Sequence, residues 1–195
     1  MPDLRAQLRR ALDRPLAPPP APRRAAVAAI LTPSDDLLFI HRAERAGDPW
    51  SGHVSLPGGR VDPGDEGPLA AAIRETREEI GLVLHVGQLI GPLTPIAPIA
   101  TATDLAIYPF LFALDHEPEP VPNEEVQAVY RVGLARLLSD EGRGPMDWSW
   151  RGQPLTLPAV AFPGELRLWG LTLRVVDELL DHVDGRGLGL DRLRR

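Results

Sequence analysis

The stretch Leu56 to Leu82, LPGGRVDPGDEGPLAAAIRETREEIGL, places the strongest constraints on the fold. Pro57-Gly58-Gly59 cannot continue a helix or a central strand, and its two glycines permit positive φ angles and close approach of other groups to the backbone. Asp62-Pro63-Gly64 forms a second turn. Residues from Glu66 to Ile80 are good helix formers and Gly81 follows as a stop, so the stretch predicts a strand end, a tight loop and an acidic helix.

This helix is predicted to have one apolar and one acidic side. At 3.6 residues per turn, a single stripe faces a core and consists of Leu69, Ile73, Thr76 and Ile80. Roughly the opposite side carries three acids and two small residues: Glu75, Glu78, Glu79, Ala71 and Ala72. A solvated acidic face is the plain interpretation. A cation site is the alternative, because a cation would turn the repulsion between neighbouring acids, about 0.2–0.5 kcal/mol per pair, into binding.

The ligands available for such a cation are all oxygens, namely the three carboxylates, water and a loop carbonyl such as that of Gly59. Oxygen donors favour a hard cation, Mg²⁺ or Mn²⁺. Both ions usually share their coordination shell with substrate phosphates, so the expected substrate carries a phosphate chain. Arg74 lies one residue before Glu75 and four before Glu78, where it can hold a carboxylate in orientation.

The same residues resemble the Nudix box of the Nudix hydrolase superfamily. They are Gly59, six intervening residues, Glu66, seven more, and then Arg74-Glu75-Thr76-Arg77-Glu78-Glu79-Ile80-Gly81-Leu82. The gap from Gly59 to Glu66 is one residue longer than in the usual box, which is itself a feature of the coenzyme A pyrophosphatase branch. Thr76 stands where the box usually has an aliphatic residue.

Sequence outside the box also resembles the coenzyme A pyrophosphatase family. Gly52 to Gly59, GHVSLPGG, is similar to the GxxxFPGG motif ahead of the box, with Leu56 in place of Phe. Arg42-Ala43 and Arg45 resemble the arginines of that motif, although their spacing to Gly52 is one residue longer. Leu168 to Thr172 resembles the C-terminal region of the same family. The resemblance implies an α/β/α sandwich with a mixed β-sheet, and hydrolysis of coenzyme A to 3′,5′-ADP and 4′-phosphopantetheine.

Hydrolysis of a diphosphate needs a cation to withdraw charge, an activated water and a stabilised leaving phosphate. Glu75 and Glu79 are the first-choice metal ligands, with the carbonyl of Gly59, while Glu78 shares a second ion or orients water. The general base is either Glu78 or an acid of the loop Asp115 to Glu125, where Glu124 and Glu125 are the candidates. Sequence does not choose between them.

Substrate binding is assigned to Arg42, Arg45 and Gly58. In a chain whose basic residues are all arginine, the partner for the 3′-phosphate of coenzyme A is an arginine, and Arg45 is favoured over Arg42. His53 is expected to be a surface or packing residue rather than a phosphate ligand. Three hypotheses follow: a coenzyme A pyrophosphatase, the same chemistry on ADP-ribose or a dinucleotide, and a non-catalytic binding module, which the intact acidic triad disfavours.

Composition narrows the class of protein further. The 21 basic and 27 acidic residues give a net charge of −6, which argues against a broad basic surface for nucleic acid. No apolar run approaches a membrane span and no signal peptide is expected, so we expect a cytoplasmic protein. With no cysteine, disulfides and thiolate chemistry are excluded.

The chain divides into a helix and Pro-rich linker (1–22), a catalytic domain (23–184) and a tail (185–195) that is expected to fray. Helices are predicted at 3–14, 66–80, 134–138 and 168–183 from their apolar periodicity. Strands are predicted at 25–31, 37–41, 83–90, 103–114 and 126–130, with a further hairpin at 148–162. Strands alternating with long helices predict an α/β domain.

Overall fold

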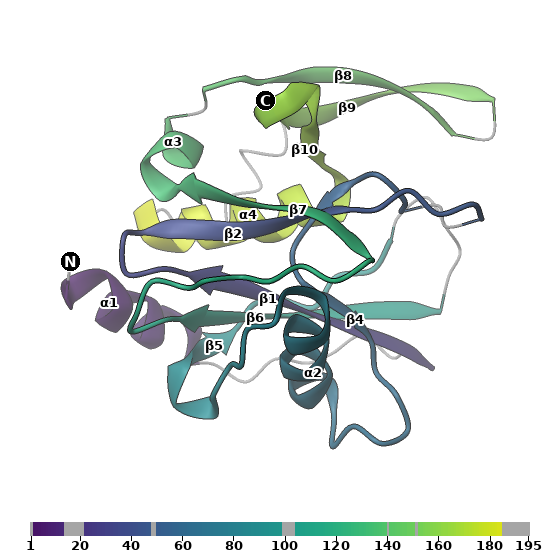
Figure 1. Ribbon diagram of the computed structural model, residues 1–195. Coiled ribbons are helices and arrows are strands. Elements are labelled where there is room, and N and C mark those ends of the chain that lie inside the picture. The colour runs from purple at the N-terminus through teal and green to yellow at the C-terminus, as the bar shows by residue number, and fades with distance from the viewer. Residues whose placement is uncertain are drawn as a thin grey trace.

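The computed structural model describes residues 2–13, 22–47, 50–98, 104–139, 141–150 and 152–184. In these residues a seven-stranded mixed sheet lies between helices, and a separate three-stranded sheet lies beside it (Figure 1). The large sheet consists of β1 (Arg23–Leu31), β2 (Asp36–Arg42), β3 (Val54–Ser55), β4 (Gly58–Arg60), β5 (Leu89–Pro92), β6 (Leu105–Ala113) and β7 (Val126–Gly133). The small sheet consists of β8 (Arg143–Trp150), β9 (Gln153–Ala161) and β10 (Arg167–Trp169). The α-helices are α1 (Pro2–Leu12), α2 (Pro68–Ile80), α3 (Leu134–Leu138) and α4 (Gly170–Asp184), and the two 3₁₀ turns are η1 (Val86–Gln88) and η2 (Pro163–Glu165).

Strand β1 is the centre of the large sheet and pairs with three strands. It runs parallel to β6 along its whole length, from Arg23 opposite Leu105 to Leu31 opposite Ala113. Its other edge is shared, because β4 pairs antiparallel with its first half and β2 pairs antiparallel at its end, where Leu31 lies opposite Leu37. Along this edge, β1 thus pairs first with β4 and then with β2. The Gly58-Gly59 segment belongs to β4 and lies next to α2.

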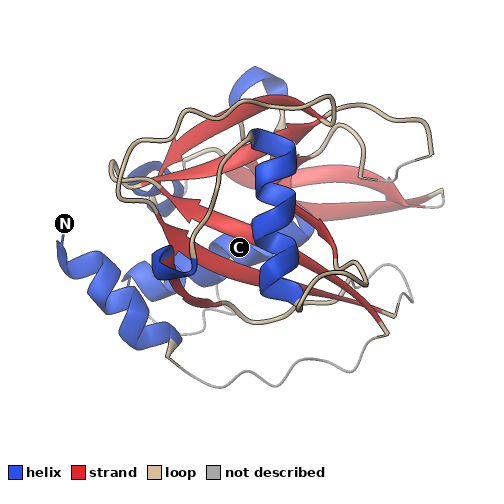
Figure 2. Ribbon diagram, turned by 60° about the horizontal axis from the view of Figure 1, so that its bottom comes forward, coloured by secondary structure: helices blue, strands red, loops and turns tan. Residues whose placement is uncertain are grey.

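Alternating side chains of β1 and its neighbours build a core on each face of the sheet. Ala28 and Ile30 face α2 and join a cluster with Phe112 and Ile80. The other face packs against α1 and α4 in a larger cluster that includes Leu8, Leu31, Phe39, Leu111, Leu173 and Leu179. Figure 2 shows α2 in front of the sheet and α4 behind it. The predicted α/β/α sandwich with a mixed sheet is confirmed.

Several boundaries differ from those that the sequence predicted. Residues 83–88 are not a strand, and η1 lies there instead, so β5 begins at Leu89. Leu168 belongs to β10, because it pairs with Val160, and α4 begins two residues later. The predicted linker 15–22 lies almost wholly outside the described residues, and the tail 185–195 lies outside them entirely. None of the helices in the described ranges is both long and apolar enough to cross a membrane.

Candidate active site

Helix α2 positions the acidic side chains, and both of its ends are well defined. Pro68 stands in the first turn, where its missing N–H is not needed. Gly81 ends the helix in the left-handed conformation, with φ of 69°, and its N–H donates to the carbonyl of Arg77. The loop Asp115 to Glu125, here called the acidic loop, binds the last turn of α2. The N–H of Val121 donates to Ile80 O, and the N–H of Asn123 donates to Glu79 O. The predicted approach of this loop to the site is thus seen.

The predicted apolar stripe faces the core, since Ile80 is buried there with Leu69 and Ile73 packed against it, but the opposite side predicted for the acids and small residues is also partly buried. Ala71 and Ala72 are fully buried against Ala26 of β1, and Glu79 is only 2% exposed. The physical reason is that small residues let the helix approach the sheet closely, so the turn that carries Glu79 is drawn into the interior. The acids consequently differ in exposure: the side chains of Glu79, Glu75 and Glu78 are 3%, 18% and 47% exposed.

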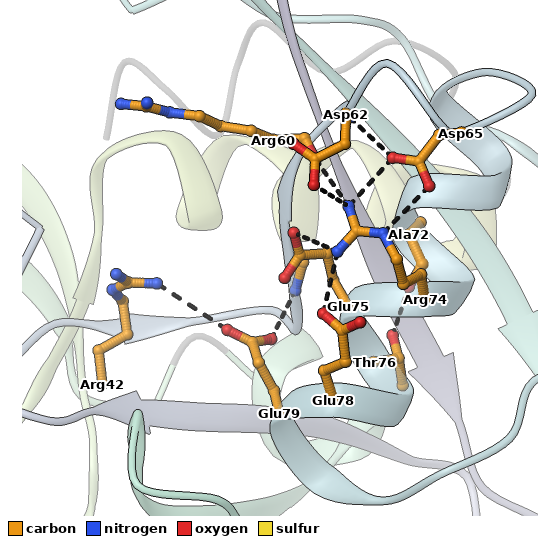
Figure 3. Close-up of polar contacts among 11 residues, drawn as sticks. Arg42, Arg60, Asp62, Asp65, Ala72, Arg74, Glu75, Thr76, Glu78 and Glu79 are labelled. Carbon is orange, nitrogen blue, oxygen red and sulfur yellow. Dashed lines mark hydrogen bonds and ion pairs between the residues drawn. The ribbon is translucent and has the colours of Figure 1, made fainter.

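Glu79 lies between the glycine segment and strand β2 (Figure 3). Its Oε2 accepts a hydrogen bond of 2.8 Å from the N–H of Gly58, and its Oε1 is 4.0 Å from Nη1 of Arg42. Burial raises the pKa of Glu79 to about 8, although the Gly58 hydrogen bond and the Arg42 charge both act to lower it. The carboxylate is therefore poorly compensated by the protein alone. Gly58, a predicted substrate ligand, uses its N–H to hold this acid.

Arg74 connects the loop after β4 to two of the box acids (Figure 3). Its Nη1 lies 3.0 Å from Glu75 Oε1 and 2.9 Å from Glu78 Oε2, so the predicted orienting contact is present. Its Nε and Nη2 each donate to Asp65 at 3.0 Å, and Nη2 also donates to the carbonyl of Arg60. The hydrogen bond from Arg74 lowers the pKa of Asp65. Asp65 was not among the predicted site residues, although its place directly after the Asp62-Pro63-Gly64 turn was a signal.

Among the described residues, no group of three or more His, Asp or Glu side chains is close enough together to hold a metal ion. Arg74 lies against Glu75 and Glu78, while Glu79 turns toward Gly58. The donors nevertheless fit a hard cation, because Glu79 is buried without a full counter-charge and burial likewise raises the pKa of Glu75. A side chain at Gly59 would also collide with Glu75, since a Cβ there would lie 2.3 Å from Oε1.

A cavity of about 740 Å³ adjoins these acids. Its inner wall is apolar and includes Val27, Leu56, Ile96, Ile107, Leu171 and Val175. Four arginines and no acidic side chain line it in the part of the chain that the structure describes: Arg23, Arg42, Arg45 and Arg60. The predicted ligands Arg42 and Arg45 therefore lie in one cavity, whereas Gly58 does not line it. Arg42 links the cavity to the acidic side chains of α2, because it lines the cavity and also faces Glu79.

Aromatic side chains form another wall of the cavity. His53 packs edge-to-face on Trp169, with ring centroids 4.9 Å apart, and on Trp148 at 5.7 Å. Trp148 and Trp169 lie 4.6 Å apart, so the small sheet supports this wall from behind. His53 is thus a packing residue as expected, and it also lines the cavity. Trp169 lies in the segment Leu168 to Thr172 that resembles the family, but its place in the cavity was not predicted, because the resemblance does not say what this segment contacts.

The acidic loop also contacts the loop before the box. Arg45 Nη1 lies 3.0 Å from Glu125 Oε1, and its Nη2 lies 3.8 Å from Glu124 Oε1. The N–H of Ala43 donates to the carbonyl of Glu125. These two candidate bases therefore lie beside Arg45, at the rim of the cavity.

An acidic helix beside a glycine segment in an α/β/α sandwich defines the class of Nudix hydrolases, and comparison with known proteins confirms it. The NUDIX domain family matches residues 22–148, and the chain belongs to this family. It is 34% identical to the human protein named mitochondrial coenzyme A diphosphatase NUDT8, over 79% of this chain and 68% of that protein. The mouse protein of the same name is 35% identical, over 80% and 77%. The solved structure of a MutT/nudix family protein from Enterococcus faecalis has a TM-score of 0.50 at 19% identity, covering 90% of this chain and 71% of that chain, which supports the fold alone.

Proposed function

We propose that this Nudix hydrolase cleaves the diphosphate bond of coenzyme A or one of its derivatives, releasing 3′,5′-ADP and 4′-phosphopantetheine. The position of Arg42 carries this proposal, because one guanidinium faces the buried Glu79 and also lines the arginine-rich cavity. A substrate in the cavity would thus present its phosphates to the box acids. The names of the human and mouse relatives support coenzyme A as the substrate.

The box residues have separate roles in this proposal. Glu75, Glu79 and the carbonyl of Gly59 would hold Mg²⁺ or Mn²⁺, with Glu78 available to a second ion. When bound, such an ion withdraws charge from the phosphate and lowers the pKa of a water. Arg74 orients Glu75 and Glu78 through its contacts with both.

Exposed acids are the candidates for the general base, and residues of the cavity walls would bind the substrate and exclude water. Glu78 is our candidate for the general base, because it is the box acid that water reaches most easily. Glu125 and Glu124 are the alternatives at the cavity rim. Arg42 would bind a phosphate oxygen, and the apolar inner wall would exclude bulk water from the bound diphosphate.

A substrate panel tests this function. Coenzyme A, dephospho-coenzyme A, ADP-ribose and a dinucleotide are incubated with the enzyme and Mg²⁺ or Mn²⁺, and the products are resolved by chromatography. We expect the highest kcat/KM for coenzyme A, with 3′,5′-ADP as one product. A higher kcat/KM for ADP-ribose would overturn the substrate and favour the alternative hypothesis.

We also propose a cytoplasmic location, which fractionation of the native cells tests. The relatives' names include the word mitochondrial, so recovery of the protein in an organelle fraction is the outcome that would overturn this.

A further inference from the structure

The four arginines of the cavity have different electrostatic surroundings. Arg42 faces Glu79, and Arg45 is ion-paired with Glu125 and lies near Glu124. The guanidinium groups of the other two, Arg23 and Arg60, make no hydrogen bond or ion pair with any residue that the structure describes. Both residues are exposed to solvent at the cavity. Two positive charges without a partner among the described residues therefore line the same cavity.

The sheet register places these two arginines on one face. Arg60 of β4 lies opposite Ala25 of β1, and Arg23 is two residues from Ala25 along that strand. Such diagonal neighbours lie roughly 7–8 Å apart, which long side chains can span. Their shared neighbour on this face is the small Ala25, and the adjacent strand β6 presents Leu105 and Ile107, which carry no charge. The two side chains can thus converge on one anion.

This pair lies close to the box acids but on the other face of β4. Gly59 directs its vacant side-chain position at Glu75, so the next residue, Arg60, projects to the opposite face, toward the cavity. Figure 3 shows the Arg60 side chain extending away from Arg74 and Glu75. The carbonyl of Arg60 meanwhile accepts a hydrogen bond of 3.0 Å from Arg74. An anion bound by Arg60 would therefore lie near a diphosphate held at the acids, at a separate point.

We propose that Arg23 and Arg60 form a second anion site, which binds a phosphate monoester that the substrate carries besides its diphosphate. The inference rests on the proposed function, in which this group is the 3′-phosphate of coenzyme A. It assigns to Arg23 and Arg60 the role that the sequence suggested for Arg45. Arg45 is less suited, because its charge is already shared with Glu125. Arginine is the side chain best matched to a phosphate dianion, since its donors bind two oxygens at once.

The test compares coenzyme A with dephospho-coenzyme A, which lacks only the 3′-phosphate. Arg60→Gln and Arg23→Gln should each lower kcat/KM for coenzyme A by about 10- to 150-fold, the usual effect of a charge-assisted contact, and change it little for dephospho-coenzyme A. Arg24→Gln is the matched control. Arg24 neighbours Arg23 on β1 and is also exposed, but it does not line the cavity.

A binding measurement gives a readout that does not depend on turnover. Adenosine 3′,5′-bisphosphate should bind the wild type more tightly than AMP in calorimetry, and Arg60→Gln should remove most of that difference. Arg24→Gln should keep it.

Three results would overturn the inference. Equal losses for both coenzyme A substrates in Arg60→Gln would mean that Arg60 holds the diphosphate or the strand. Loss of the preference in Arg45→Ala alone would assign the 3′-phosphate to Arg45. A wild type that cleaves both substrates equally would have no second anion site, although the proposed function would stand. If the wild type cleaves neither, the proposed function fails, and calorimetry with adenosine 3′,5′-bisphosphate and AMP still decides the anion site.

Discussion

Helices α2 and α4 both carry buried acidic side chains, but these differ in the number of hydrogen bonds and counter-charges that compensate them. On α4, Asp177 is 2% exposed and contacts Arg143 at 2.5 and 3.3 Å. Glu178 accepts hydrogen bonds from the N–H of Thr94, at 3.0 and 3.1 Å, and from its hydroxyl at 2.7 Å. On α2, Glu79 is equally buried, but it has one hydrogen bond from Gly58 and a guanidinium 4.0 Å away.

The pKa values of these acids move in opposite directions for this reason. Burial acts to raise the pKa of Glu178, but the adjacent His182 and the Thr94 donors hold it below its ordinary value. Burial dominates at Glu79 and raises its pKa to about 8. A buried acid whose oxygens accept several hydrogen bonds stabilises the contact between secondary-structure elements. A buried acid with few donors at the edge of a cavity is typical of a functional site. The comparison predicts that substitutions on α2 affect activity and those on α4 affect stability.

The largest effect is expected from Glu79→Gln. The change removes charge from the proposed metal site at nearly constant volume, so kcat should fall at least about 100-fold while the melting temperature is kept or rises. Activity in saturating Mg²⁺ and thermal unfolding measure the two quantities. Glu178→Gln is the matched control and should keep its activity. Near-normal turnover of Glu79→Gln in saturating Mg²⁺ would remove Glu79 from the ligand set.

The next largest effect is expected from Asp177→Asn, which acts on stability. It breaks the buried ion pair between Asp177 and Arg143, and such a loss costs about 3 kcal/mol. For a chain of this size, the melting temperature should fall by about 6–12 °C, with kcat of the folded enzyme unchanged. The double variant Arg143→Met/Asp177→Leu should recover much of the loss, because apolar residues remove both charges. A fall in kcat without loss of stability would contradict the structural role of α4.

A smaller effect, about 1 kcal/mol, is expected from Glu178→Gln and should depend on pH. The folded pKa of Glu178 lies below its ordinary value of 4.5, so its charged form stabilises the fold above about pH 4.5. That contribution is lost as the pH falls through the folded pKa. Urea unfolding should therefore show wild type and variant converging as the pH falls below about 4.5. A difference that grows as the pH falls would contradict the assignment.

Local signals in the sequence predicted the helix boundaries best. Gly81 and the run of helix formers before it predicted the end of α2, which begins at Pro68 rather than at the predicted Glu66, and α3 occupies the predicted residues 134–138. Prediction was wrong where a segment's structure depends on distant partners. Residues 83–88 are apolar enough for a strand but find no pairing strand, and Leu168 leaves the predicted helix because it pairs with Val160.

The sequence by itself determined the class of chemistry: a glycine segment followed by a helix with Glu75, Glu78 and Glu79, oxygen donors for a hard cation, and arginine as the cation for phosphate. Only the tertiary structure decided which of these charged groups are compensated by a hydrogen bond or an ion pair within the protein. Burial of Glu79 depends on how closely α2 packs on β1, and the pairing of Arg45 with Glu125 joins residues 80 positions apart. Arg23 and Arg60 lie on one face of the sheet only because β1 and β4 pair in one register. Charge is a property of a residue type, but its compensation depends on the neighbours that the fold supplies.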